Sequence, residues 1–348
     1  MSQSYAVLNR ILDVTAIVNI PIKIIVMVIV VRYSTPEMHS FAMLLFNGLF
    51  WNFMANFIYA FLHFSPLYPL ECFRVDGLAT WFADSEPFGH ILFCALAFCI
   101  LNCALALPAT FVYRYVIFVH PMTAVKLKRQ WVIAFCIVVH AVTIGVMSYR
   151  YYFWIIFSSE YPTKEGLQQK ELIFCFKPHG PDKDSVIVLF LVILLLALVI
   201  AVASTTLLLF NIHRISATFD NIYLQSHRRI LRTLICIMAV PILLGGIPLT
   251  LFVITVLRPD MRYVHNISAV SIVILANHGT VYAIALTAAI KPYRVGASEF
   301  FKRVFKRNVV NGLVETAIVF VKVRGIDVMR ADRFRSEDNP FSNVLYDI

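Results

Sequence analysis

The chain has 348 residues, of which 60% are hydrophobic and 14% are charged, and its formal net charge is +10. Soluble globular domains carry about 25% charged residues, so much of this chain does not face water. The basic residues do not indicate nucleic-acid binding, because they follow the ends of apolar stretches and do not gather on one soluble segment.

Seven apolar stretches are long enough to cross a bilayer as helices, each of which needs about 20 residues. The sequence therefore predicts an all-α membrane protein with a bundle of seven transmembrane helices in residues 1–297. The fourth stretch is short and polar residues interrupt the seventh, so six or eight helices are the alternatives. The predicted spans are Ile11–Val31, Phe41–Leu62, Ile91–Val112, Trp131–Ser148, Ser185–Phe210, Thr233–Leu257 and Val264–Ile290.

The loops between these stretches predict the orientation. If the N-terminus is outside the cell, the inner loops and the C-terminal tail hold about twenty Lys and Arg residues and the outer segments hold nine. Positively charged loops stay in the cytoplasm, so we expect the N-terminus outside and the C-terminus inside.

Two cysteines, Cys72 and Cys175, fall in predicted outer loops. Because these loops face an oxidising compartment, we expect a disulfide between the first and second outer loops. Cys94, near the outer end of the third span, is the alternative partner for Cys175. No spacing of cysteine and histidine indicates a metal site, and we expect no cofactor.

The segment after the last span alternates apolar and basic residues with a helical period. Phenylalanines at Phe300, Phe301 and Phe305 fall on one face, and Lys and Arg fall on the other. This pattern predicts an amphipathic helix at the lipid surface over residues 298–310, with an ordinary basic tail as the alternative. Residues 311–348 are charged and irregular, and predict a disordered cytoplasmic tail.

Polar residues inside the spans are costly in hydrocarbon, so each one suggests a role. Lys23 lies about 12 Å from the inner end of its span, which is a long reach to water even for lysine. We expect it to face the bundle interior and to bind asparagines or backbone carbonyls, in a structural or a ligand-binding role. Interhelical hydrogen bonds are the expected role of the others, which are Asn47, Asn52, Asn56, Asn102, His140, Asn277 and His278.

The sixth span contains Pro241, Gly245, Gly246 and Pro248 within eight residues. Each proline removes a backbone hydrogen bond, so the helix is predicted to bend here. The bend is either static or a hinge for the inner half of the helix. Sequence motifs of phosphate-binding loops, zinc proteases and serine hydrolases are absent, so we do not expect an enzyme.

Several short motifs follow one another in an order that resembles the nematode serpentine chemoreceptors, with class h and its relatives in the Str superfamily as the closest groups. The motifs are Pro21-Ile22-Lys23, Ser34-Thr35-Pro36-Glu37-Met38, Leu44-Leu45-Phe46-Asn47 with Trp51, His278-Gly279 and Lys291-Pro292-Tyr293-Arg294.

This resemblance implies a rhodopsin-like architecture and chemosensory signalling through heterotrimeric G proteins, with no particular ligand. The sequence departs from the pattern at two places. Asn56 stands where class h usually has an acid, which puts a charge-dependent role there in doubt. Tyr113-Arg114-Tyr115 stands where many rhodopsin-like receptors carry Asp-Arg-Tyr, so an inner lock that needs the acid is not expected.

We therefore expect a G-protein-coupled receptor for a small environmental molecule, in the plasma membrane of sensory neurons or their cilia. The ligand would lie among the outer halves of helices three, five, six and seven, with Phe93, Asn102 and Tyr282 as candidate contacts. Arg114 and the inner loops would receive the G protein. The loop residues assigned to this contact are Lys126, Lys128, Arg129, Arg228 and Arg229.

Two other classes of function are alternatives to the receptor. One is a ligand-gated channel or a transporter with seven helices, and a channel of the insect receptor type would place its N-terminus inside the cell. The other is a scaffold that assists the trafficking of other receptors. The sequence identifies neither the ligand nor the oligomeric state.

Overall fold

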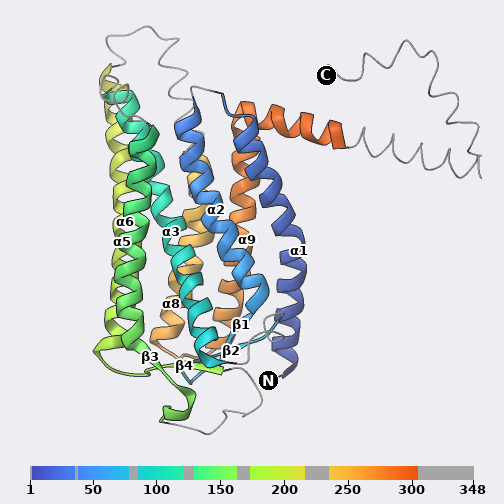
Figure 1. The fold of residues 1–348 in the computed structure, drawn as a ribbon, viewed down its shortest axis with the longest axis vertical. Coiled ribbons are helices and arrows are strands. Elements are labelled where there is room, and N and C mark those ends of the chain that lie inside the picture. The colour runs from blue at the N-terminus through green and yellow to red at the C-terminus, as the bar shows by residue number, and fades with distance from the viewer. Residues whose placement is uncertain are drawn as a thin grey trace, which may run out of the picture. The chain divides into compact units, whose positions relative to one another are not determined.

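The computed structural model describes residues 2–35, 38–77, 85–120, 129–162, 173–215 and 235–304. The chain divides into two compact units, Met1–Arg294 and Val295–Ile348. The first unit is a bundle of long helices with a small sheet across one end, close to the N-terminus (Figure 1).

Seven helices in the described part of the chain are long and apolar enough to cross a membrane, which confirms the predicted seven-helix bundle. The sixth is composite, because residues 235–240 and two further elements form one continuous rod. The elements are α1 (Ser2–Arg32), α2 (His39–Leu62), α3 (Glu86–Val119), α5 (Arg129–Trp154), α6 (Pro181–Ile215), η4 (Pro241–Gly246), α8 (Ile247–Leu257) and α9 (Val264–Ala289).

Most helices extend beyond the apolar stretches that predict them. The third span begins at Glu86 instead of residue 91, and the fourth ends at Trp154 instead of residue 148. Backbone hydrogen bonds continue into the membrane interface, where charged and aromatic side chains reach water. Hydropathy therefore marks the apolar centre of each helix and misses its ends.

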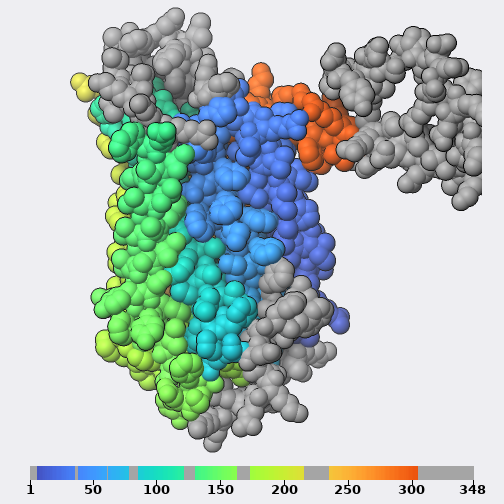
Figure 2. All heavy atoms as spheres, viewed as in Figure 1, coloured from blue at the N-terminus to red at the C-terminus, as the bar shows by residue number. Residues whose placement is uncertain are grey.

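Helix α3 lies at the centre of the bundle, where it contacts α2, α5 and α6. Helix α1 packs against α2 and α9, and α8 packs against α9. The outer surfaces of α5 and α6 carry large exposed apolar side chains, among them Trp131, Phe135 and Leu195. Helix α5 runs along one border of the face that Figure 2 shows, in green. Such surfaces are expected to contact lipid.

Four short antiparallel strands form the sheet, in the order β1-β2-β4-β3. Cys72 lies directly opposite Cys175 in the register of β2 and β4, and the two are joined by a disulfide. Cys94, the alternative partner, is a free cysteine. The strands are β1 (Phe64–Pro66), β2 (Cys72–Val75), β3 (Ile155–Ile156) and β4 (Ile173–Phe176).

Aromatic side chains attach the sheet to the helices. Phe174 and Phe176 of β4 are completely buried. Phe93 of α3 lies between them, with ring centroids 5.7 Å and 5.4 Å away. The indole of Trp154 stacks on Phe176 at 4.2 Å. We call this end of the bundle the sheet end, and the opposite end, where Arg114 lies on α3, the Arg114 end.

Residues 291–304 are helical, so the helix expected over residues 298–310 begins earlier in the chain. Within the second unit, Arg303 pairs with Glu299 one turn away, at 3.6 Å. The remainder of this predicted helix and the predicted tail lie outside the described residues.

Candidate functional site

Lys23 is the most buried charged side chain of the described bundle, with 1% of its surface exposed. Its Nζ donates a hydrogen bond to Asn52 Oδ1 on α2, at 2.6 Å. Because lysine can only donate, the carbonyl oxygen of Asn52 must face it, and this orients the amide. Asn52 Nδ2 then lies 3.1 Å from His278 Nε2 on α9, which must accept.

This chain of donors determines the tautomer of His278. Since Nε2 accepts from Asn52, the ring proton resides on Nδ1, which donates to the carbonyl of Leu275 at 2.6 Å. One positive charge is thus connected through an amide to a neutral imidazole. Gly279 permits the arrangement, because a Cβ at this position would overlap the Asn52 amide.

A second layer of amides surrounds this group. Asn19, one turn before Lys23 on α1, donates to the carbonyl of Ala276 at 3.1 Å. Asn56, one turn after Asn52, donates to the same carbonyl at 2.8 Å. Asn277 accepts from Asn19 at 3.3 Å. Helices α1, α2 and α9 are therefore joined by one polar cluster at mid-span, and Asn56 makes a neutral contact in it.

A cavity of about 30 Å³ adjoins the polar cluster. Asn52 and His278 line it, together with Cys103 of α3, Tyr282 of α9 and Pro241 of the sixth helix. It has room for about two water-sized molecules, since one needs roughly 10–15 Å³. A larger ligand would need the helices to move apart.

The sixth helix meets the polar cluster through a π-helical turn. Pro241–Gly246 forms this turn, where the sequence predicted a bend. A Cβ at Gly245 would lie 3.2 Å from the His278 ring, so a larger residue here would push the imidazole away by a few tenths of an ångström. π-helical turns inside α-helices are frequent at functional sites. The hinge role of this segment stays a prediction.

A separate network joins α2, α3 and α5. Trp51 Nε1 donates to Asn47 Oδ1 at 3.0 Å, so Asn47 Nδ2 donates to His140 Nε2 at 3.1 Å. His140 Nδ1 then donates to Asn102 Oδ1 at 2.7 Å. The amide nitrogen of Asn102 is buried and has no hydrogen-bond partner in the described part of the chain.

The structure does not bring the three candidate ligand contacts together. Phe93 belongs to the aromatic cluster under the sheet, and Asn102 is completely buried behind His140. Tyr282 lines the cavity, but it lies in the half of α9 nearer to Ala289, away from the sheet end. In the predicted orientation, with the sheet end outside the cell, Tyr282 lies in the inner half of the bundle, and its contact with a ligand stays a prediction.

At the Arg114 end, the guanidinium of Arg114 lies over the ring of Phe41 on α2, 3.8 Å from its centre. Arg114 Nε has no hydrogen-bond partner among the described residues. Nearby, Tyr293 is completely buried. Its hydroxyl lies 3.0 Å from Ser34 Oγ, which itself donates to a carbonyl of α1, so Tyr293 is the donor. Burial raises the pKa of Tyr293, so this hydroxyl keeps its proton.

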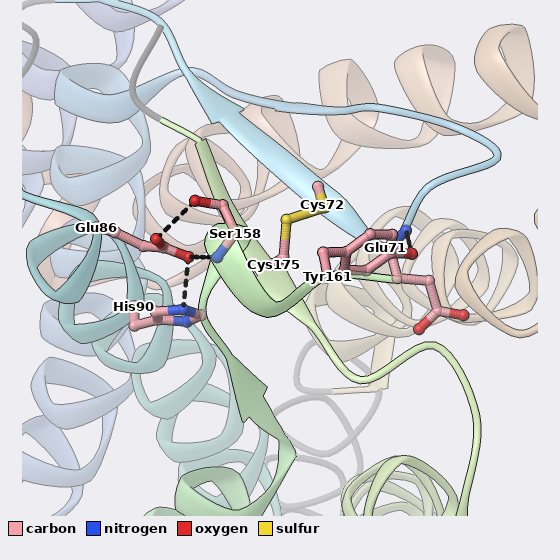
Figure 3. Close-up of a disulfide and its surroundings, with 7 residues drawn as sticks. All are labelled: Glu71, Cys72, Glu86, His90, Ser158, Tyr161 and Cys175. Atoms are coloured by element: carbon pink, nitrogen blue, oxygen red, sulfur yellow. Dashed lines mark hydrogen bonds and ion pairs between the residues drawn. A yellow bond between two sulfur atoms is a disulfide. The ribbon is translucent and has the colours of Figure 1, made fainter. Parts of the chain in front are cut away.

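Polar contacts connect the sheet to the helices on both sides of the disulfide (Figure 3). The Glu86 carboxylate accepts hydrogen bonds from the backbone and the hydroxyl of Ser158, at 2.7 Å and 2.9 Å. On the other side, Glu71 forms a buried ion pair with Lys183 of α6. Burial raises the pKa of Glu71, and the neighbouring ammonium opposes this change.

Several residues assigned to G-protein contact lie outside the description. Arg129 begins helix α5, and nothing is described of its side chain. The other four, all in the inner loops, are not described at all, and they are Lys126, Lys128, Arg228 and Arg229.

Sequence reasoning missed two features of these sites. Asn19 precedes Lys23 by four residues, and this spacing would have placed both on one face of α1. Nothing in the sequence indicates that Phe41 lies under Arg114, because the two are far apart along the chain.

The comparisons with known proteins agree with this architecture. A family model described as "Serpentine type 7TM GPCR chemoreceptor Srh" matches residues 3–303. The crystal structure of squid rhodopsin superimposes with a TM-score of 0.60 and 12% sequence identity, and the match covers 87% of each chain. At that identity the likeness shows the fold alone. No curated protein matches the chain significantly.

Proposed function

Since the chain belongs to the Srh family of serpentine seven-transmembrane chemoreceptors, we propose that it detects a small environmental molecule and activates a heterotrimeric G protein. The family match over residues 3–303 carries this proposal. The receptor would reside in the plasma membrane of sensory neurons or their cilia, with the sheet end outside the cell. The loop charges support this orientation.

The contacts of the sixth helix suggest how binding would be transmitted. The polar cluster touches the π-helical turn through His278 and Gly245. A ligand that enlarges the cavity would press on this turn, because Pro241 forms part of its wall together with residues of α2, α3 and α9. Binding would then favour a state in which the sixth helix is shifted at the Arg114 end.

Arg114 is the side chain that we assign to the G protein. Its guanidinium presents five donors in a fixed geometry and lies over the apolar face of Phe41 on α2, while its Nε has no hydrogen-bond partner among the described residues. The shift of the sixth helix would open a cleft beside it. Arg114 would then bind carbonyl groups of the partner's C-terminal helix, while Lys and Arg of the inner loops surround it.

An odorant panel applied to cells that express the receptor, with a calcium or cAMP readout, tests the proposal. Once a ligand is known, Arg114→Lys can be tested, which keeps the positive charge and removes the planar guanidinium with its five donors. We expect normal surface level and ligand binding, and at least a tenfold loss of G-protein activation, about 1.4 kcal/mol.

Arg262→Lys is the matched control for this experiment. Arg262 also lies over an aromatic ring, that of Tyr263 at 4.9 Å, but at the sheet end. We expect it to signal normally. Unchanged signalling in Arg114→Lys would remove Arg114 from the coupling site, and ligand-gated current without a G protein would favour the channel.

A further inference from the structure

We propose that Lys23 and the adjoining cavity form a binding site for a small monovalent anion, either a halide ion or the carboxylate head group of an organic acid. The site lies in the middle of the bundle, between α1, α2, α3 and α9. Binding there needs no G protein, so it can be tested apart from the proposed function.

The first argument is charge balance. Lys23 is 1% exposed and its ammonium donates to a neutral amide, Asn52, at 2.6 Å. No carboxylate in the described residues forms an ion pair with it. Removing an ammonium from water costs several kcal/mol, which one neutral hydrogen bond does not recover. A bound anion would supply the missing counter-charge.

The second argument is the chemistry of the cavity wall. Asn52, which binds Lys23, lines the cavity, and so does Tyr282, whose hydroxyl can donate; the Cys103 thiol in the same wall donates to the carbonyl of Gly48. The described residues offer the Tyr282 hydroxyl no hydrogen-bond partner. Asn52 and His278 use their remaining polar atoms on each other. The space therefore offers the Tyr282 hydroxyl as a donor and is separated from the Lys23 ammonium by the Asn52 amide, and the nearby positive charge favours an anion over a cation.

The size of the cavity limits the ligand. A volume of about 30 Å³ accepts a single halide ion or a carboxylate group without movement of the helices, whereas the tail of a longer acid needs the cavity to widen. An organic acid would place its carboxylate here and its apolar tail towards the sixth helix, where Met238 and Pro241 complete the wall. An organic acid bound in this way would contact the π-helical turn directly.

The test is thermal unfolding of the purified full-length receptor in detergent at constant sodium concentration. Two titrations are compared, one with chloride and bromide and one with formate, acetate and propionate. We expect a saturable rise in melting temperature in at least one series. Lys23→Met should weaken the apparent anion affinity at least tenfold. Lys177→Met, which removes an exposed lysine, should leave it unchanged.

A variant that keeps the charge protects the test against misfolding of Lys23→Met. Leu107→Phe fills the cavity from α3 and leaves Lys23 and Asn52 in place. We expect it to bind neither series. Stabilisation by the halides alone would identify the occupant as a bound halide ion. Stabilisation that grows with the chain length of the acid would identify it as the carboxylate head group of an organic acid. Either result supports the site. Equal anion dependence in wild type, Lys23→Met and Leu107→Phe, or no dependence at all, overturns it.

Discussion

The two ends of the helix bundle are held together by different kinds of contact. The sheet end has a disulfide, a buried ion pair and a cluster of stacked aromatic rings that joins β4 to α3 and α5. At the Arg114 end, the described contacts include a cation–π contact, one hydroxyl pair and a small apolar cluster between α3 and α6. A covalent bond and buried charges are costly to break, whereas the other contacts are worth about 1 kcal/mol each.

This difference indicates where the protein can change shape. Free energies of local opening vary across a structure, and elements that move are found where contacts are weak. We therefore expect the sheet end to stay fixed while the Arg114 end rearranges, with the π-helical turn between them.

The largest expected effect concerns the disulfide. Cys72→Ser removes a bond between residues 103 positions apart. By chain entropy a loop of this size stabilises by about 4.7 kcal/mol. We expect a loss of about 2–5 kcal/mol, seen as a lower melting temperature and surface level. Cys94→Ser is the control and should resemble wild type, because Cys94 is free.

The buried pair of Glu71 and Lys183 should have the next largest effect. Glu71→Leu leaves the ammonium of Lys183 buried, with the Pro178 carbonyl as its one remaining acceptor in the described part of the chain, and we expect a loss of about 3 kcal/mol. The double variant with Lys183→Met should recover most of this loss in a denaturation experiment.

A second pair in the same region is the control for this cycle. Lys177 and Asp182 are 2.8 Å apart and each is 39% exposed, so Lys177→Met should cost less than about 1 kcal/mol. A similar loss from both pairs would mean that burial does not distinguish them, and that the sheet end is less rigid than described.

At the Arg114 end, Phe41→Leu removes the ring beneath the guanidinium. A cation–π contact is worth about 0.5–2 kcal/mol, so release of Arg114 should raise ligand-free G-protein activation about two- to thirtyfold. Phe50→Leu, at a half-exposed ring on the same helix, should leave it unchanged. Lower activity in Phe41→Leu would show that the ring positions Arg114 for coupling instead of restraining it.

The smallest expected effect is that of Tyr293→Phe. The lost bond to Ser34 should cost about 1 kcal/mol of stability, and Ser34→Ala should add little to it. Since burial raises the pKa of Tyr293, the loss should be the same at all pH values up to about 10. If the stability losses of the two single variants added fully in the double variant, the hydrogen bond between Tyr293 and Ser34 would be contradicted.

The membrane explains why so much of the architecture is visible in the sequence. Every backbone polar group in hydrocarbon must be satisfied within a helix, so long apolar stretches have one available structure. The same cost makes a buried lysine conspicuous, and this is why the sequence predicts that Lys23 binds asparagines or backbone carbonyls. Its partner could not be chosen among several asparagines, because that choice depends on how three helices pack.

Outside the apolar stretches the sequence is less informative. The strands contain two to four residues each and show no alternation, so they were not predicted. Glu71 and Lys183 are separated by 112 positions, and only the folded sheet end brings them together. The depth of Tyr282, by contrast, follows from its position in the sequence. At 1.5 Å per residue it lies about 27 Å along α9 from Val264, well beyond the middle of a bilayer.

The π-helical turn also determines how the sixth helix responds to a change in its length. Such a turn holds one residue more than the α-helical turn that it replaces, so deleting one residue from Pro241–Gly246 would restore α-helix and leave α8 close to its present orientation. Residues in an α-helix advance by about 100° each, so the same deletion near the start of α8 would rotate the following residues by that angle, and Thr255 would lose its 2.8 Å contact with Tyr68 near the sheet. The π-helical turn is therefore the segment of the sixth helix where the loss of one residue disturbs the contacts at the sheet end least.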